Sequence, residues 1–517
     1  MTVSTASAEC LLEPPTKTND VTRLGQRAAR ALTWNYAGTV VKAACQLVTG
    51  IVLARLLGPH PYGVVAVAWL VIGLGNLVSD LGMCAALVQC KSITESQIRH
   101  VFTVQLVAGL VLAAATAAAA RTLAAIYGEP ELLRVVRWLA LLFLLQSGGQ
   151  TATALLKREL RFRELQMAQI ASYVVGFCGA GIPLAMFGFG VWALVAAQLG
   201  QAMLYSAVVY RLAPHPLRPV IIRRDTTFQF GIQVIGTNLI NWLITNMDGA
   251  LVGRRFGATG LGIYNRGQVL ITYQAANIAS VLQNVLFSAY SRAQNGREQQ
   301  REAYLVSVTA ASAIFAPVFL TIAAAPRTVL AGLYGDRWLA AAPICVPLAL
   351  AAPFTLVMSL AGPLLWANAR VMAELRAQLI TCSVAVGIFL AAAGISAQAV
   401  AWACFATSAL RCGLMTCAVT GVLGMPVRQL VRNLRGAAAI CLLACGVAFA
   451  SDRLSETSHV PPVLRLVLVG MAAIGAMATA TIIWPNAVLG PCLAKAARRN
   501  LALFPETVQA ALRRLEP

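Results

Sequence analysis

The stretch FQFGIQVIGTNLINWLITNMDGALVGRRF, residues 228–256, combines the length of a membrane span with a row of polar side chains. A transmembrane helix needs about 20 mostly apolar residues, and this stretch supplies them. At about 100° per residue, an arc of roughly 80° holds Asn238, Asn241, Thr245 and Asp248. Because polar groups at membrane depth face a protein interior or a water-filled cavity, we expect a helix with one wet face.

The same row occurs 199 residues earlier, where Thr39, Lys42, Gln46 and Thr49 align with it in unbroken register. The helix ends match as well, since residues 55–63 and 254–262 both read RxxGxxxxG. A second pair, IYGE at 126–129 and LYGD at 333–336, lies 207 residues apart. The pattern indicates two copies of one unit, each opening on a helix with a wet face.

Composition places the chain in a membrane. Hydrophobic residues make up 59%, charged residues 11%, and the mean hydropathy is +0.73, whereas soluble domains are about 25% charged. The excess of 40 Lys and Arg over 19 Asp and Glu lies in short loops between apolar spans. That distribution favours positive-inside topology over nucleic-acid binding. The 13 cysteines form no CxxC pair and the four histidines are scattered, so we predict no metal or cofactor.

The hydropathy pattern predicts an all-α polytopic protein of about 14 spans. They lie at about 31–57, 62–88, 100–120, 131–155, 165–187, 189–212, 228–256, 260–290, 302–325, 338–367, 371–394, 396–422, 433–451 and 461–484. Its domains are a cytosolic N-terminal segment at 1–30, a six-helix lobe at 31–212, a cytosolic linker at 213–227, a second six-helix lobe at 228–422, an extra helix pair at 433–484 and a cytosolic tail at 485–517. Most Lys and Arg residues then lie on one side, which places both termini in the cytosol. Each lobe has an even number of spans, so the lobes are expected to be parallel repeats.

Several charged and polar residues inside spans are candidates for a binding site. Lys42 lies roughly 16 Å into the first span, where it either snorkels to the surface or lines a wet face with Gln46. Arg266 and Asn277 share a stripe on the eighth span, although Arg266 can also sit at the helix start. Arg411, in the twelfth span, is either a structural pairing partner or a cavity residue.

Asp248 has two open interpretations. It is a counter-ion to Arg255 or Arg266, or it is an acid that couples transport to protons. The counter-ion is favoured because the arginines lie nearby in sequence and the stripe holds no second acid.

The chain lacks the motifs of nucleotide-hydrolysing, sugar-transferring and serine-dependent enzymes. There is no Walker A loop, no DxD motif and no GxSxG, and the expected outer loops are short. We therefore predict a transporter, with a membrane polymerase or ligase as the less favoured class.

Six segments together resemble one family: LARLLGPHPYGVVAVA (53–68), SDLGMCAALVQ (79–89), LLKRELRFREL (155–165), GFGVWALVAAQL (188–199), MDGALVGRRFGATGLGIYNRG (247–267) and NVLFSAYSRAQ (284–294). They are similar to the Wzx-type polysaccharide-unit flippases of the multidrug/oligosaccharidyl-lipid/polysaccharide exporter superfamily. The resemblance covers most of residues 30–420. It implies two six-helix lobes around a central cavity and an extra helix pair.

The resemblance also implies a function. Members flip undecaprenyl-diphosphate-linked oligosaccharides across the bacterial inner membrane for exopolysaccharide, capsule or O-antigen assembly, with membrane lipid, polymerase and export machinery as candidate partners. The expected substrate-binding residues are Lys42, Gln46, Asn238, Asn241, Asp248, Arg255, Arg266, Asn277 and Arg411. Similar drug exporters commonly carry an acid in the first span, where this chain has Lys42. An ion-coupled drug or metabolite exporter is therefore the alternative, not the first choice.

Overall fold

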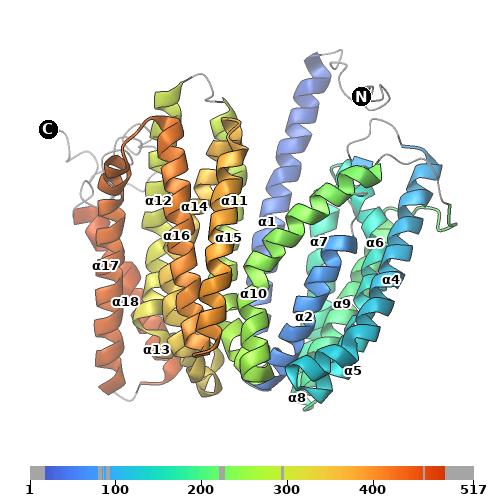
Figure 1. Cartoon of the computed structure of the whole chain (residues 1–517), viewed down its shortest axis with the longest axis horizontal. Helices are drawn as coiled ribbons and strands as arrows, with labels where there is room; N and C mark the ends of the chain where they lie inside the picture. The colour runs from blue at the N-terminus through green and yellow to red at the C-terminus, as the bar shows by residue number, and fades with distance from the viewer. Residues whose placement is uncertain are drawn as a thin grey trace. The chain divides into compact units, whose positions relative to one another are not determined.

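The protein is all-helical in the part of the chain that the computed structural model describes, residues 18–79, 84, 87–88, 93–220, 227–292, 296–457 and 460–483 (Figure 1). This confirms the predicted all-α polytopic class. The chain divides into two compact units, Met1–Gly262 and Ile263–Pro517. The tail predicted at 485–517 and the linker residues 221–226 lie outside the described residues.

Unit 1 is built from helices that follow the first predicted set of spans. They are α1 (Thr18–Leu57), α2 (Pro59–Ser79), α4 (Glu95–Tyr127), α5 (Pro130–Leu139), α6 (Leu141–Arg158), α7 (Phe162–Tyr173), the π-helical η2 (Val174–Gly181), α8 (Ile182–Met186), α9 (Val191–Leu212) and most of α10 (Thr227–Gly267). A capping box of Thr94 and Gln97 starts α4, and Gly128 ends it with a left-handed φ of 64°. α4 and α9 both pack against α6.

Unit 2 contains the remaining spans and one short helix that the sequence did not reveal. Its elements are the end of α10, η3 (Gln268–Thr272), α11 (Tyr273–Arg292), α12 (Arg297–Ala324), α13 (Pro326–Tyr334), η4 (Asp336–Ala341), α14 (Ala342–Ala367), α15 (Val371–Ala393), α16 (Ala397–Leu423), α17 (Val427–Thr457) and α18 (Pro462–Ile483). Pro326 lies in the first turn of α13 and Gly335 ends it with a φ of 88°, so α13 forms a separate helix after α12.

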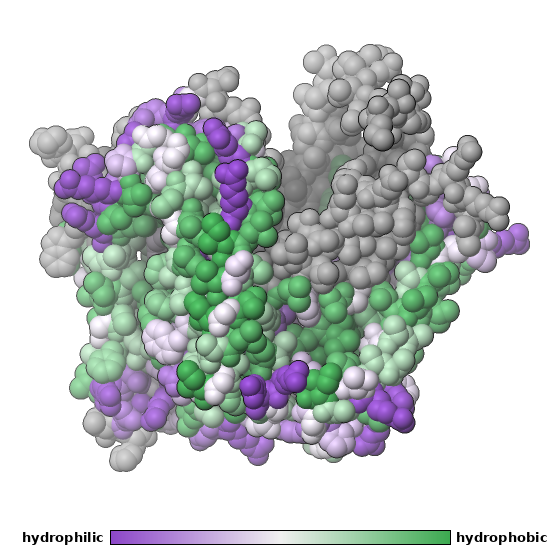
Figure 2. Space-filling model, viewed as in Figure 1, coloured by the Kyte–Doolittle hydropathy of each residue, from purple (hydrophilic) through white to green (hydrophobic). Residues whose placement is uncertain are grey.

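Eleven helical stretches of the described chain are long and apolar enough to cross a membrane. The predicted spans at 62–88, 228–256 and 260–290 are helical where they are described, as α2, α10 and α11, but are not among these eleven. The single span predicted at 131–155 is divided into α5 and α6 at Ala140. α1 begins at Thr18, within the N-terminal segment predicted to precede the first span. Figure 2 shows hydrophobic residues over the middle of the unit 2 helices and hydrophilic residues towards their ends.

α10 belongs to unit 1 as far as Gly262, although its sequence was predicted to begin the second lobe. A Cβ built on Gly73 of α2 would lie 2.9 Å from the indole nitrogen of Trp242 in α10, and one on Gly253 would lie 2.8 Å from the ring of Tyr127. These close approaches join α10 to α2 and α4. The division into two six-helix lobes at residues 213–227 stays a prediction.

The two RxxGxxxxG motifs contain a backbone-on-backbone helix contact. A Cβ on Gly63 would lie 1.6 Å from the carbonyl oxygen of Ala258, and one on Gly262 would lie 2.1 Å from that of Pro59. The glycine of each motif thus lies against a backbone carbonyl of the other motif, and the two contacts occupy equivalent positions of the predicted repeat. Small residues of this kind let membrane helices approach closely.

The first glycine of each motif adopts a positive φ, whereas the second provides room for the helix contact. Gly58 lies between α1 and α2 with a φ of 75°, and Gly257 bends α10 with a φ of 67° and a ψ of −174°. Other residues rarely adopt these conformations. The matching roles of all four glycines support the repeat that the sequence predicts.

The helix contact predicts that even a methyl group at its centre is costly. Gly63→Ala should lower the free energy of unfolding by about 1–3 kcal/mol or more, because the obstructing atom is backbone and cannot move aside. The loss is measured as a lower thermal midpoint and poorer monodispersity of the purified protein in detergent.

Gly148→Ala in α6 is the matched control, since nothing lies within 4 Å of its Cβ position. It should be neutral or slightly stabilising, as alanine favours helix. Equal midpoints for the two variants would show that the contact at Gly63 is not tight.

Candidate functional site

The polar stripe of α1, which was predicted to be a wet face, packs in part against α7 and η2 inside unit 1. Lys42 donates a hydrogen bond from Nζ to Oε1 of Gln169 at 3.2 Å, and Thr49 Oγ1 lies 3.4 Å from Cys178 Sγ. Lys42 is half-buried, whereas Gln46 is exposed. The predicted stripe therefore has an interior part, at Lys42 and Thr49, and an accessible part at Gln46.

Lys42 begins a row of polar side chains that crosses unit 1. Gln169 on α7 lies close enough to the Tyr205 hydroxyl on α9 for the two side chains to interact. The Tyr205 hydroxyl lies 3.1 Å from Thr153 Oγ1 on α6, and Thr153 donates to the carbonyl of Gly149 at 2.8 Å. The row thus reaches from α1 through α7 and α9 to α6, and all its members can exchange hydrogen bonds with hydroxyl groups.

The charge of Lys42 has no acidic partner in the described chain, where no carboxylate oxygen lies within 4.0 Å of Nζ. Gln169 supplies a neutral acceptor, which satisfies one of the three N–H donors without cancelling the charge. A half-buried ammonium without a carboxylate attracts an anion more strongly than one at the surface, because the low dielectric screens it less.

A second buried polar group lies deeper between α4 and α6. Gln105 and Thr151 are fully buried, and Thr151 Oγ1 donates to Gln105 Oε1 at 3.0 Å. Gln105 Nε2 also lies 2.8 Å from the sulfur of Cys84. None of these residues, nor Gln169 or Tyr205, was predicted to belong to a site, although each is a polar residue within a predicted span.

The stripe of the second repeat is described only in part. The side chains of Asn238 and Asn241 lie outside the described residues. Asp248 is buried, with 5% exposure, and its Oδ1 accepts the Gly249 N–H at 2.7 Å, while Arg255 is exposed. The choice between counter-ion and coupling acid stays a prediction.

Arg266 lies in the packed interior of unit 2. Its guanidinium carbon is 5.5 Å from the ring centre of Tyr334 and 5.3 Å from that of Trp338, and its exposed fraction is 4%. The aromatic faces stabilise the cation. Because this burial leaves little surface for a substrate, Arg266 is not carried into the site proposed below.

The other two candidates of unit 2 differ from each other. Asn277 is exposed on α11, and Arg411 is half-buried on α16, where Glu374 of α15 is its electrostatic neighbour. The Glu374 carboxylate also accepts hydrogen bonds from Trp366 and Gln378. This environment suits the structural pairing that was one of two interpretations of Arg411.

The sequence is similar to that of several proteins of polysaccharide biosynthesis. A family model described as "Polysaccharide biosynthesis protein" matches residues 52–343. Teichuronic acid biosynthesis protein TuaB of Bacillus subtilis is 28% identical over 302 residues, covering 57% of this chain and 62% of TuaB. Succinoglycan biosynthesis transport protein ExoT of Rhizobium meliloti is 26% identical over 325 residues, covering 62% and 65%. The chain thus aligns with less than two thirds of the length of TuaB and of ExoT.

Lipopolysaccharide biosynthesis protein WzxC of Escherichia coli is 22% identical over 354 residues, covering 67% of this chain and 71% of WzxC. Among solved structures, lipid II flippase MurJ in an inward closed conformation aligns with a TM-score of 0.69 and 10% identity, over 87% of this chain and 99% of MurJ. An inward-facing MATE family multidrug transporter aligns with a TM-score of 0.55 and 16% identity, over 74% and 94%. At these identities the structures show a shared fold.

Proposed function

The chain belongs to the Wzx-type family of polysaccharide biosynthesis proteins within the multidrug/oligosaccharidyl-lipid/polysaccharide superfamily, and from this premise we propose that it flips lipid-linked oligosaccharide units. The substrate would be an oligosaccharide on undecaprenyl diphosphate, moved across the bacterial inner membrane for exopolysaccharide, capsule or O-antigen assembly. The relatives named for succinoglycan transport and lipopolysaccharide biosynthesis support this substrate class.

The observation that carries the proposal is the environment of Lys42. A diphosphate brings negative charge to membrane depth, where it needs a compensating cation. Lys42 offers an ammonium that is held by Gln169 and faces no carboxylate among the described side chains. A substrate diphosphate would complete the ion pair, and the amide of Gln169 would keep the ammonium oriented in its absence.

The sugar part of the substrate needs many weak hydrogen bonds. Gln46 is exposed beside Lys42, and Gln169 and Tyr205 continue the polar row. Amide and hydroxyl groups both donate and accept, so they suit sugar hydroxyls and can exchange partners during release. Asn238, Asn241 and Asn277 are the corresponding candidates of the second repeat.

We propose alternating access as the mechanism. The head group would enter a cavity between the lobes while the polyprenyl chain stays in the lipid, and rocking of the lobes would expose the cavity to the other side. Both termini would lie in the cytosol. Polymerase and export machinery would take the product on the outer side.

An ion-coupled drug exporter is the second candidate, favoured by the fold shared with a MATE transporter and by the buried carboxylate of Asp248. The positive charge of Lys42 weighs against it, because a cationic drug would be repelled where a diphosphate would be attracted.

Deletion of the gene tests the proposed function. Lipid-linked repeat units should accumulate with their sugars on the cytosolic face, since synthesis continues while export stops. The sugars of the lipid-linked units would be labelled with an impermeant reagent, once in intact cells and once in permeabilised cells. The polyprenyl-linked lipids would then be extracted, and the labelled amounts would be compared. Normal polymer export together with lost dye efflux would support the drug exporter and contradict the flippase.

Substitution of Lys42 tests the role of its charge. Lys42→Ala should leave membrane insertion intact, because removal of a charge at membrane depth does not hinder insertion. Polymer export should fall by about tenfold or more, as expected when one charge-assisted hydrogen bond is lost. Lys42→Arg should restore part of it.

Lys157→Ala is the matched control, since Lys157 is an exposed lysine in the last turn of α6. It should export polymer at the level of the unchanged protein. Full export by Lys42→Ala, at equal protein level, would remove Lys42 from the substrate site.

A further inference from the structure

A cavity of about 660 Å³ lies within unit 2, and none of its lining residues belongs to the polar row. It is lined by residues of α13, η4, α14, α17 and α18, in the part of the extra helix pair where α17 ends and α18 begins. Its volume is in the range of small-ligand sites. The lining combines three arginines and three acids with apolar side chains such as Leu339, Val346 and Phe449.

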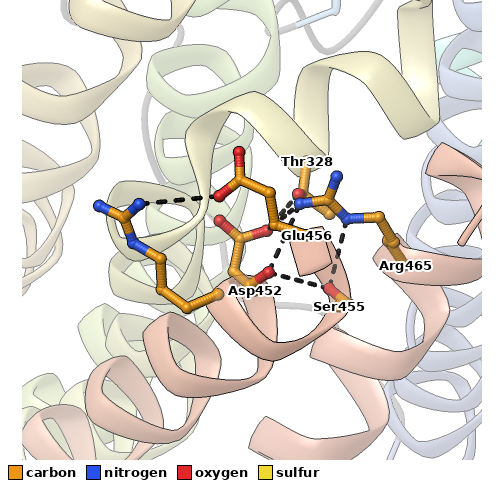
Figure 3. Close-up of polar contacts among 6 residues, drawn as sticks. Thr328, Asp452, Ser455, Glu456 and Arg465 are labelled. Carbon is orange, nitrogen blue, oxygen red and sulfur yellow. Dashed lines mark hydrogen bonds and ion pairs between the residues drawn. The ribbon is translucent and has the colours of Figure 1, made fainter. Parts of the chain in front are cut away.

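One set of charges in this cavity is already paired. Arg465 on α18 lies 3.2 Å from Asp452 on α17, and its Nε donates to Ser455 Oγ at 3.3 Å (Figure 3). Thr328 of α13 donates a hydrogen bond to the same Asp452 carboxylate. This network fastens α13 to the extra helix pair and forms a rigid wall.

A second pair lies at the exposed side of the cavity. Arg453 is 3.7 Å from Glu456, and its guanidinium carbon lies 5.3 Å from the ring centre of Phe449. Both charged side chains are more than half exposed. Exposed pairs of this kind are weak, so they can exchange partners with a bound ligand.

Two further lining residues of opposite charge form no ion pair within the described chain. Arg327 of α13 and Asp336 of η4 both line the cavity and are exposed, and neither has a hydrogen-bond or ion-pair partner among the described residues. A ligand that carries one anionic and one cationic group close together would match both. A ligand with only one sign of charge would leave one of them unpaired.

The surroundings point to a lipid. α17 and α18 expose large apolar side chains beside lining residues in the sequence: Leu454, after Arg453, is 72% exposed and Leu464, before Arg465, is 51% exposed. In a chain with eleven candidate spans, such surfaces face acyl chains. The cavity therefore lies where a polar head group can enter it while its tails stay in the membrane.

We propose that this cavity binds the head group of a zwitterionic aminophospholipid of the phosphatidylethanolamine type. The phosphate accepts hydrogen bonds from Arg327, and the ammonium donates to Asp336. A primary ammonium has three donors for a carboxylate, whereas a trimethylated one has none. The bound lipid bridges α13 and η4 to the ends of α17 and α18.

Native mass spectrometry of the purified full-length protein tests the proposal, with dioleoyl phosphatidylethanolamine, phosphatidylglycerol and phosphatidylcholine as probes. The ethanolamine lipid should bind most tightly. Arg327→Gln should weaken its binding by about tenfold or more, the effect of a lost charge-assisted hydrogen bond. Asp336→Asn should weaken it to the level of phosphatidylglycerol, because only the contact to the ammonium is lost.

Arg337→Gln is the control, since Arg337 is an exposed arginine next to Asp336 that does not line the cavity. It should bind the ethanolamine lipid unchanged. The thermal midpoints of the two cavity variants should be unchanged, because Arg327 and Asp336 are exposed; this measurement shows that the variants are folded.

Three results would overturn the proposal. They are equal binding of phosphatidylglycerol and phosphatidylethanolamine by the unchanged protein, unchanged lipid binding in both cavity variants, and displacement of the lipid by an equal concentration of glycerophosphoethanolamine. The last would identify a soluble zwitterion as the ligand, because that compound has the head group without the tails.

Discussion

The contact between the two glycine motifs fixes how the helices of unit 1 can be arranged. At Gly63 and Gly262 the backbone of one helix touches that of the other, and neither position has room for a side chain. In lipid, where burial of apolar surface does not drive helices together, close approach of this kind provides van der Waals attraction between them. Because the glycine of each motif contacts a carbonyl of the other, the reciprocal contact requires both copies of the motif.

Three of the described charged side chains within predicted spans are accommodated in different ways. Arg266 lies between aromatic rings, Asp248 is buried and accepts a backbone N–H, and Lys42 is held by the neutral amide of Gln169. The first arrangement leaves little access for a ligand. The last leaves a net positive charge that a substrate can use, which is why Lys42 is central to the proposed function.

Much of the fold could be predicted because membrane spans are a local property of the sequence. About 20 apolar residues form a helix wherever they occur, and glycine with positive φ marks the ends at Gly58, Gly128 and Gly335. The break at Ala140 was missed because apolar composition continues through it. The helix α13 was missed because its 9 residues are too few for a span and lie between two predicted spans. Hydropathy alone does not separate one long span from two short helices.

The candidate site was predicted less completely, because it depends on which helices become neighbours. The position of Lys42 on a wet face follows from its spacing to Gln46 and Thr49. Its partner Gln169 and the continuation to Tyr205 depend on the packing of α1, α7 and α9, which no local pattern contains. The aromatic neighbours of Arg266 are equally remote in sequence, so its burial could not be foreseen.

Reconstitution of the purified protein in vesicles would show whether it flips a lipid-linked oligosaccharide with the help of Lys42. Vesicles would carry a polyprenyl-diphosphate-linked oligosaccharide on the inner leaflet, and an impermeant glycosidase added outside would report its arrival on the outer leaflet. If Lys42 binds the diphosphate, the cleaved fraction should rise in vesicles containing the unchanged protein and stay at the protein-free level with Lys42→Ala. No rise above protein-free vesicles with a folded, correctly inserted protein would contradict it.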